Sequence, residues 1–292
     1  MINSLKRLMT ENSLAVSFFL ASVSMSFGAF AEQTQQPTIA IIIDDIGNLY
    51  KNGAELARFP YPLTLSFLPK RPHTQELIKI AEQNHKEIML HSPMENSHGL
   101  KLGYGALTED MSEQQIKSTL ADSIKNIHHM VGINNHMGSR LTSNPIAMRW
   151  VMETIQKHPF FFVDSRTSSK TVAADIASSY RIPNLSRDVF LDHKQTRGFI
   201  QKQFNKLIRI AKETGTALAI GHPHASTIEY LSRALPKLDE RGVSISTVSA
   251  LWQIRHPKLT MQQYAHSNTA FIDSIAQHSE SSGQYIHHKA PL

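Results

Sequence analysis

Acidic and histidine side chains follow several apolar segments of this 292-residue chain, each where a predicted strand ends. These strand-end residues are Asp44 and Asp45, His91, Asn134-Asn135-His136, Asp164 and His222. In a parallel α/β sheet the carboxyl ends of all strands lie on one rim, where ligands bind. Acidic or histidine ends on five separate strands therefore indicate a functional site more strongly than any one of them alone.

These residue types favour a divalent-metal site that hydrolyses an amide or an ester. Two neutral imidazoles and one carboxylate can hold an ion and leave positions for water and substrate. Of the adjacent acids Asp44 and Asp45, one can bind the ion while the other acts as a base, and His222 can protonate the leaving group. The chain has no cysteine, so the ligands must be His, Asp or Glu, which suit zinc and neighbouring divalent ions.

The same residues also have structural explanations. Two acids after a strand often cap the next helix, and a lone histidine such as His91 is more often hydrogen-bonded structure. Asp164 can cap the segment that follows it, and His222-Pro223-His224 can form a rigid turn. A glycoside hydrolase is a weaker alternative, because its two carboxylates must flank the bond from two faces.

Short apolar strands alternate with amphipathic helices along most of the chain. The expected strands are 38–45, 62–68, 87–91, 132–136, 160–164, 217–222 and 243–248. Capping patterns that predict helices begin at Ser112, Asn144 and Ser226, the first and last with Gln115 and Glu229 as capping-box partners. The alternation predicts an α/β fold with a mainly parallel sheet, and its size allows either a barrel or a doubly wound sheet in one domain.

The two ends of the chain differ from this pattern. Residues 1–31 combine Lys6 and Arg7, a short apolar core and Ala29-Phe30-Ala31, which is typical of a signal peptide. The apolar core is shorter than the ~20 residues of a membrane-spanning helix, and an uncleaved anchor is the alternative. We therefore expect export to the periplasm and no membrane span after cleavage. Residues 32–37 are a polar lead-in, 38–255 form the domain, and 256–292 are a polar tail expected to be weakly ordered.

The charge pattern indicates which partners to expect. The formal net charge is +6, and the basic residues are scattered with no Lys/Arg block. Such a modest excess is compatible with an anionic envelope polymer and gives no support for a nucleic-acid partner.

The segments IDDIG, MLHSPME, NNHMGSR, VDSRTS, FLD and IGHPH, in this order and spacing, resemble the divergent polysaccharide deacetylase family. That family is a remote branch of the NodB-type carbohydrate esterases. The resemblance covers roughly Thr38 to Trp252. It implies a distorted seven-stranded (β/α) barrel and the metal-dependent removal of acetyl groups from N-acetylated sugars.

The resemblance also implies roles for the two acids and the metal ligands. Asp44 matches the general base of NodB-type enzymes, and Asp45 matches their metal-binding acid. His136 matches the first histidine of their H-x-x-x-H metal motif. Arg140 stands where the second histidine would be, and His91 is then the substitute ligand.

Two further catalytic roles follow from the same resemblance. His222 matches the late catalytic histidine, and Asp164 is expected to orient a histidine or the metal-bound water. The leading hypothesis is a periplasmic, Zn²⁺-dependent deacetylase or related amidohydrolase acting on an envelope or extracellular glycan. The alternative from another class is a non-catalytic glycan-binding or scaffolding protein on the same fold. No organic cofactor is expected, and the sequence indicates no particular protein partner.

Overall fold

The computed structural model describes residues 36–261, 263 and 264. The expected signal peptide, most of the polar lead-in and most of the expected C-terminal tail lie outside these residues. Within the described residues, no helix is both long and apolar enough to cross a membrane.

A nine-stranded sheet forms the centre of the described chain, and all its strand pairs are parallel. The strands are β1 (Thr38–Ile46), β2 (Thr64–Phe67), β3 (Glu87–Met94), β4 (Gly132–Met137), β5 (Phe161–Asp164), β6 (Asn184–Ser186), β7 (Val189–Phe190), β8 (Thr216–Gly221) and β9 (Ser244–Ser246). Their order is β6-β5-β4-β3-β2-β1-β8-β7, and β9 also pairs with β1. All seven expected strands are present. The expected total of seven is too low, because β6 and β7 have only three and two residues and carry no readable hydrophobic pattern.

The sheet curls into a distorted barrel. Strands β6 and β7 stand at opposite ends of the sheet order, yet only Arg187 and Asp188 separate them in the chain. The N–H of Arg187 donates to the carbonyl of Asp164 in β5 (3.0 Å), and the N–H of Asp188 donates to the carbonyl of Leu218 in β8 (2.9 Å). Two residues can join the two edges only if the sheet bends round. The barrel interpretation is therefore confirmed over the doubly wound sheet.

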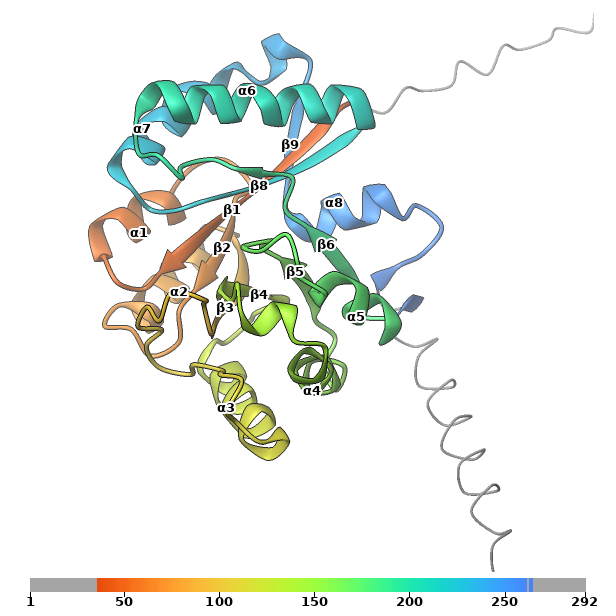
Figure 1. Cartoon of the computed structure of the whole chain (residues 1–292). Helices are drawn as coiled ribbons and strands as arrows, with labels where there is room; N and C mark the ends of the chain where they lie inside the picture. The colour runs from red at the N-terminus through yellow and green to blue at the C-terminus, as the bar shows by residue number, and fades with distance from the viewer. Residues whose placement is uncertain (1–35, 262, 265–292) are drawn as a thin grey trace, which may run out of the picture. The chain divides into compact units, whose positions relative to one another are not determined.

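Helices surround this barrel, α1 to α7 on its outside and α8 at one end. They are α1 (Tyr50–Ala57), α2 (Thr74–Gln83), α3 (Glu113–Asn126), α4 (Pro145–Ile155), α5 (Ala173–Ser179), α6 (Arg197–Thr214), α7 (Ala225–Ala234) and α8 (Val248–Arg255). Helices α6 and α7 lie at the top of Figure 1, next to β1 and β8, whereas α3 and α4 lie at the bottom. The capping box of Ser112 and Gln115 is confirmed. The one expected at Ser226 is wrong, because α7 already begins at Ala225 and its cap position, His224, makes no side-chain cap bond.

Side chains alternate between the two faces of each strand. In β1, Ile39, Ile41 and Ile43 join the apolar layer under the outer helices. Ala40 and Ile42 belong to a second apolar cluster inside the barrel. Because successive strand residues point to opposite faces, the next inner position of β1 is Asp44. This alternation determines which strand-end residues face the interior.

Helix α8 closes the barrel at the amino-terminal ends of the strands. Its Leu251 and Trp252 are buried within the inner cluster. The carboxylate of Glu87, the first residue of β3, accepts N–H bonds from Val248 (2.9 Å) and Ser249 (3.2 Å) at the start of α8. A carboxylate is favourable there because the first N–H groups of a helix lack partners within it. The first part of the expected tail contacts this helix through Tyr264, whose ring lies 5.6 Å from that of Trp252.

Candidate metal and catalytic site

The carboxyl ends of the strands bring polar side chains together inside the open end of the barrel. Each of these residues comes two positions after a residue on the inner face of its strand, so it lies on the inner face as well. They are Asp44 after β1 residue Ile42, Ser66 in β2, His91 in β3, Asn134 in β4, Ser165 after β5 and His222 after β8. The structure thus places Asp44, His91 and His222, which the sequence singled out, at one end of the barrel.

Three possible ligand atoms converge in a candidate metal-binding group, named the metal-binding group below: Oδ1 of Asp45, Nε2 of His91 and Nδ1 of His136. The oxygen of Asp45 lies 2.8 Å from the His136 nitrogen and 3.3 Å from the His91 nitrogen, and the two nitrogens are 3.1 Å apart. Ligands held at ~2.0–2.1 Å by a tetrahedral zinc ion stand about 3.3 Å apart. Oδ1 of Asp45 is buried beside these two imidazole nitrogens, and no described residue gives it a well-aligned hydrogen bond. A cation would satisfy this oxygen, so the residues present fit a metal ion.

A bulge in β1 explains how two adjacent acids reach the same site. Regular alternation would turn Asp45 away from the interior that Asp44 faces. The register with β2 shifts between Ile43 and Ile46, so one extra residue lies in β1 at this point. Asp45 has a φ of 59°, in the left-handed region, which Asp tolerates better than most residues. The bulge therefore directs Asp45 back towards the two histidines.

Asn134 orients both His91, a candidate metal ligand, and the acid Asp44. Its Oδ1 lies 2.8 Å from Nδ1 of His91 and accepts a hydrogen bond from Ser66 Oγ (2.6 Å). Its Nδ2 donates to Oδ1 of Asp44 at 2.8 Å. Because the amide oxygen can only accept, the neutral form of His91 carries its proton on Nδ1 and leaves Nε2 as a lone-pair donor, the form that a metal ligand requires.

Asp44 is almost fully buried beside the metal-binding group. Its Oδ2 lies 3.6 Å from Nε2 of His91, while its Oδ1 is held by Asn134. Burial raises the pKa of Asp44 above its usual range, and the nearby His91 and His222 only partly offset this effect. For Asp45, burial acts in the same direction, but the imidazoles of His136 and His91 hold its pKa well below the usual range. The two neighbouring carboxyls therefore differ in proton affinity, as a base and a ligand should.

His222 is fixed by an acid that sequence reasoning did not single out. Its Nδ1 lies 2.9 Å from Oδ1 of Asp192, and its backbone N–H donates to Oδ2 of the same residue (2.6 Å). The hydroxyl of Thr227 also donates to this Oδ2. Burial alone would lower the pKa of His222, but the hydrogen bond and charge of Asp192 outweigh it and raise the pKa to about 9. The imidazole is therefore protonated at neutral pH, with Nε2 facing Asp45 Oδ2 at 4.0 Å.

Asp164 does not make the expected contact with a histidine. It follows the inner-face residue Val163, so it points towards the outer side of the sheet. Its carboxylate accepts bonds from the N–H of Arg166 (2.8 Å) and the hydroxyl of Thr171 (2.9 Å), both in the next loop. The acid that contacts His222 is therefore Asp192 and not Asp164, while the other expected role of Asp164, orienting the metal-bound water, stays a prediction. The only sequence signal for Asp192 is the FLD segment, because the preceding strand β7 is too short to mark a strand end.

Arg140 and His224 lie beside the site without joining the metal-binding group. Arg140 is exposed and pairs with Glu109 at 2.6 Å. His224 forms a second group of possible ligands with Asp192 and His222. Both oxygens of Asp192 already accept hydrogen bonds, so this second group is a poorer metal site than the first.

The sequence matches known proteins over the segments that form the candidate site. A family model described as divergent polysaccharide deacetylase matches residues 41–252. The uncharacterized protein YibQ of Escherichia coli (strain K12) is 34% identical over 200 residues, which cover 68% of this chain and 63% of YibQ. An uncharacterized protein of Haemophilus influenzae is 33% identical over 218 residues, 75% of this chain and 78% of that protein. The match therefore spans less than two thirds of the length of YibQ.

A solved structure shares the architecture. The crystal structure of the uncharacterized protein ATU2773 from Agrobacterium tumefaciens C58 has a TM-score of 0.71 and 25% identity to this chain. The superposition covers 74% of this chain and 89% of that one. The strand ends that carry Asp44, His91, His136 and His222 all lie within the residues matched by the family model.

Proposed function

Because the chain belongs to the divergent polysaccharide deacetylase family, we propose that it is a metal-dependent deacetylase acting on N-acetylated sugars of an envelope or extracellular glycan. One observation carries this proposal. Three metal-ligand atoms lie within 3.3 Å of one another, between a buried acid and a histidine that another acid keeps protonated. Metal-dependent amide hydrolysis needs these three components together.

The ligand set favours Zn²⁺. Asp45, His91 and His136 would hold the ion with two nitrogens and one oxygen, and three protein ligands are typical of catalytic zinc sites. When bound, such an ion lowers the pKa of water and polarises a carbonyl.

The chain's own residues supply the proton transfers. Oδ2 of Asp44, whose other oxygen is held by Asn134, accepts a proton from the attacking water. His222 donates the proton on Nε2 to the departing nitrogen, while Asp192 holds the proton on Nδ1. The water oxygen bonds to the acetyl carbon as the C–N bond breaks, so the products are acetate and an amine on the sugar.

The location is part of the proposal. We place the protein in the periplasm on the strength of the signal-peptide pattern in residues 1–31. N-terminal sequencing of the protein from a periplasmic fraction should then begin near Glu32. A periplasmic chain that still begins at Met1 would contradict cleavage.

The decisive experiment measures acetate release together with metal content. The purified, zinc-loaded protein is incubated with chitin oligomers and peptidoglycan fragments, in parallel with an Asp44→Asn variant. The parent should release acetate, and the variant should keep its metal but lose about 10²–10⁴-fold in rate, because an amide cannot accept the proton. If no glycan yields acetate and both forms bind glycan equally well, the non-catalytic binding protein is the correct interpretation.

A further inference from the structure

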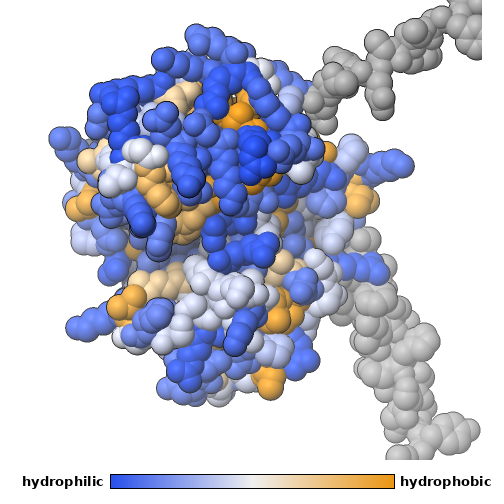
Figure 2. All heavy atoms as spheres, turned by 45° about the horizontal axis from the view of Figure 1, so that its top comes forward, coloured by the Kyte–Doolittle hydropathy of each residue, from blue (hydrophilic) through white to orange (hydrophobic). Residues whose placement is uncertain are grey.

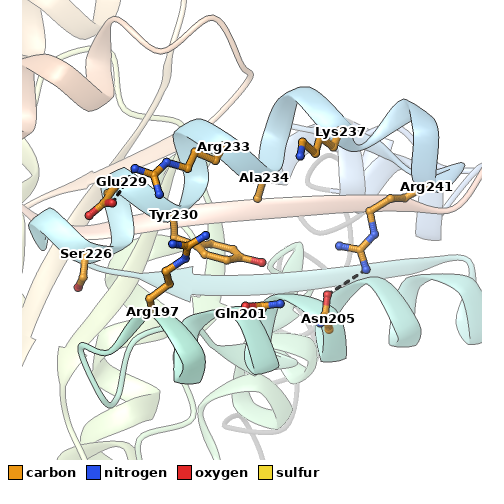
Figure 3. A pocket seen from close by; sticks show the side chains of 10 residues that line it. All are labelled: Arg197, Gln201, Asn205, Ser226, Glu229, Tyr230, Arg233, Ala234, Lys237 and Arg241. Carbon is orange, nitrogen blue, oxygen red and sulfur yellow. Dashed lines mark hydrogen bonds and ion pairs between the residues drawn. The ribbon is translucent and has the colours of Figure 1, made fainter.

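A hollow lies on the outer side of the barrel, away from the candidate metal site, between α6 and the segment that runs from α7 to Arg241 (Figure 3). Its volume is about 260 Å³. Its charged lining residues are Arg197, Arg233, Lys237 and Arg241, together with one carboxylate, Glu229. Figure 2 turns this side of the molecule forward and shows a largely hydrophilic surface.

The positive charge in this hollow is not balanced by its own lining. Glu229 pairs with Arg233 at 2.8 Å, and Arg241 donates to the amide oxygen of Asn205 at 3.0 Å. The side chains of Arg197 and Lys237 form no ion pair or hydrogen bond with any described residue. A concave surface with more cationic than anionic side chains has a high local positive potential and attracts anions.

Polar groups also face the hollow without partners. Oγ of Ser226 is buried and forms no hydrogen bond with any described residue. Figure 3 shows the Tyr230 ring between the two helices, with its hydroxyl directed along the groove near Gln201 and Asn205. Burial raises the pKa of Tyr230, and the guanidinium groups of Arg197 and Arg241 only partly counteract it. The phenol is therefore a hydrogen-bond donor that lies within electrostatic reach of both arginines.

We propose that this α6–α7 groove binds an oxyanion, a phosphate or a carboxylate, carried on a ligand about the size of one sugar unit. Guanidinium groups match phosphate and carboxylate oxygens with two parallel hydrogen bonds. Ser226 and Tyr230 add hydroxyl donors from α7. The volume of about 260 Å³ is just below the ~300–1,000 Å³ of pockets for drug-sized ligands, which favours a small anionic group over a larger ligand.

Some residues of the groove are close in sequence to residues that support His222. The proposal does not depend on deacetylation. Ser226 directly precedes Thr227, whose hydroxyl bonds to Asp192. Arg197 begins the helix that follows the loop after Asp192. A ligand in the groove would therefore contact the two segments that also support His222.

The test is a binding titration of the full chain at about 0.15 M ionic strength, where attraction beyond roughly 8 Å is screened. Inorganic phosphate, glucose 1-phosphate and glucuronate serve as probes, and isothermal calorimetry with amide NMR shifts reports affinity and location. Stronger binding of glucose 1-phosphate than of glucuronate identifies phosphate as the source of the oxyanion, and the reverse order identifies carboxylate. Shifts should concentrate in 197–205 and 226–241.

Matched variants separate a built site from general surface charge. Arg197→Gln with Lys237→Gln should weaken probe binding about tenfold or more, since hydrogen bonds to charged groups are among the stronger ones. Lys202→Gln with Lys212→Gln removes the same charge from exposed positions of α6 outside the groove and should change affinity less than about twofold. Ser226→Ala should weaken binding without altering the circular dichroism spectrum. Absence of binding by all three probes, or equal loss in both double variants, would overturn the proposal.

Discussion

The two ends of the barrel each place a carboxylate against a ring of strand ends, but the two carboxylates differ in their partners. At the closed end, Glu87 accepts bonds from the N–H groups of Val248 and Ser249 and from the Ser249 hydroxyl. At the open end, Oδ1 of Asp45 is buried beside the imidazole nitrogens of His136 (2.8 Å) and His91 (3.3 Å), but no described residue gives it a well-aligned hydrogen bond. The acid at the closed end is held by the start of a helix, whereas the acid at the open end faces two groups with which it could share a cation.

This difference separates a contact that stabilises the fold from a group of residues that can hold a ligand. A buried acceptor without a partner costs free energy, about 1–3 kcal/mol for a neutral group and more for a charged one. Asp45 adds a left-handed backbone conformation to that cost. Unfavourable terms of this kind, gathered at one residue, are typical of binding sites, where a bound ligand offsets them. Helix α8, called the plug below, closes the other end of the barrel. Both carboxylate oxygens of Glu87 accept hydrogen bonds from this helix, so this end stabilises the fold.

The largest expected effect comes from removing a ligand at the open end. His91→Ala removes one of three donors and should weaken Zn²⁺ binding by more than about 100-fold, beyond the 10–100-fold of an outer-shell change. A competition titration with a chromophoric chelator measures this affinity. Arg140→Ala is the control: this exposed residue occupies the position of the missing motif histidine, and its removal should leave affinity unchanged. Full retention of zinc by His91→Ala would show that the ion is held elsewhere.

The second prediction concerns the proton on His222. With Asp192 in place, its pKa is raised to about 9 from an ordinary value of 6.5. Because the pKa is raised on folding, the stabilisation from this pair is fully present below pH 6.5 and is lost as the pH rises through about 9. In Asp192→Asn, burial remains and only the charges of Asp44 and Asp45 still raise the pKa of His222, so this pKa should fall clearly below that of the parent.

Imidazole NMR signals of the metal-free protein, followed from pH 5 to pH 10.5, report this titration directly. A His222→Gln sample assigns the resonance. An unchanged midpoint in the Asp192→Asn variant would mean that other groups hold the proton and that Asp192 only packs against the ring.

Much of the open end could be predicted from the sequence, because strand ends on one rim are brought together by topology alone. Asp44, His91 and His222 follow apolar runs that are long enough to read as strands. Asn134 is among the polar strand-end residues, and its position two residues before His136, on the same face, could have given it a role beside the ligands. Asp192 could not be identified from strand periodicity, since it follows a two-residue strand, and only the FLD segment of the resemblance marks it. The bulge at Asp45 is also hidden, because it depends on pairing with β2 and not on local composition.

The third prediction tests the support of the open end. Asn134→Ala removes the acceptor for His91 Nδ1 and the donor to Asp44 at once. Loss of an outer-shell contact should weaken metal binding about 10–100-fold, less than loss of the ligand itself. Asn134→Asp is a useful companion, because it keeps the acceptor for His91 and introduces a negative charge beside Asp44. If the histidine contact dominates, the Asp variant should bind metal better than the Ala variant. Equal metal affinity in the parent and Asn134→Ala would show that His91 is oriented by its packing alone.

The smallest expected effect lies at the closed end. Glu87→Gln keeps the size of the side chain but replaces a carboxylate at the start of α8 with a neutral amide. It should lower the free energy of unfolding by about 1–2 kcal/mol, the range of helix-capping and helix-dipole effects. Urea denaturation at pH 7 measures this change, and zinc affinity measured on the same samples should stay at the parent value. Glu229→Gln is the control, because its exposed pair with Arg233 should contribute only about 0–1 kcal/mol. A Glu87→Gln protein with parent stability and weakened zinc binding would reverse the contrast between the two ends, since the plug would then act on the metal-binding group instead of on the fold.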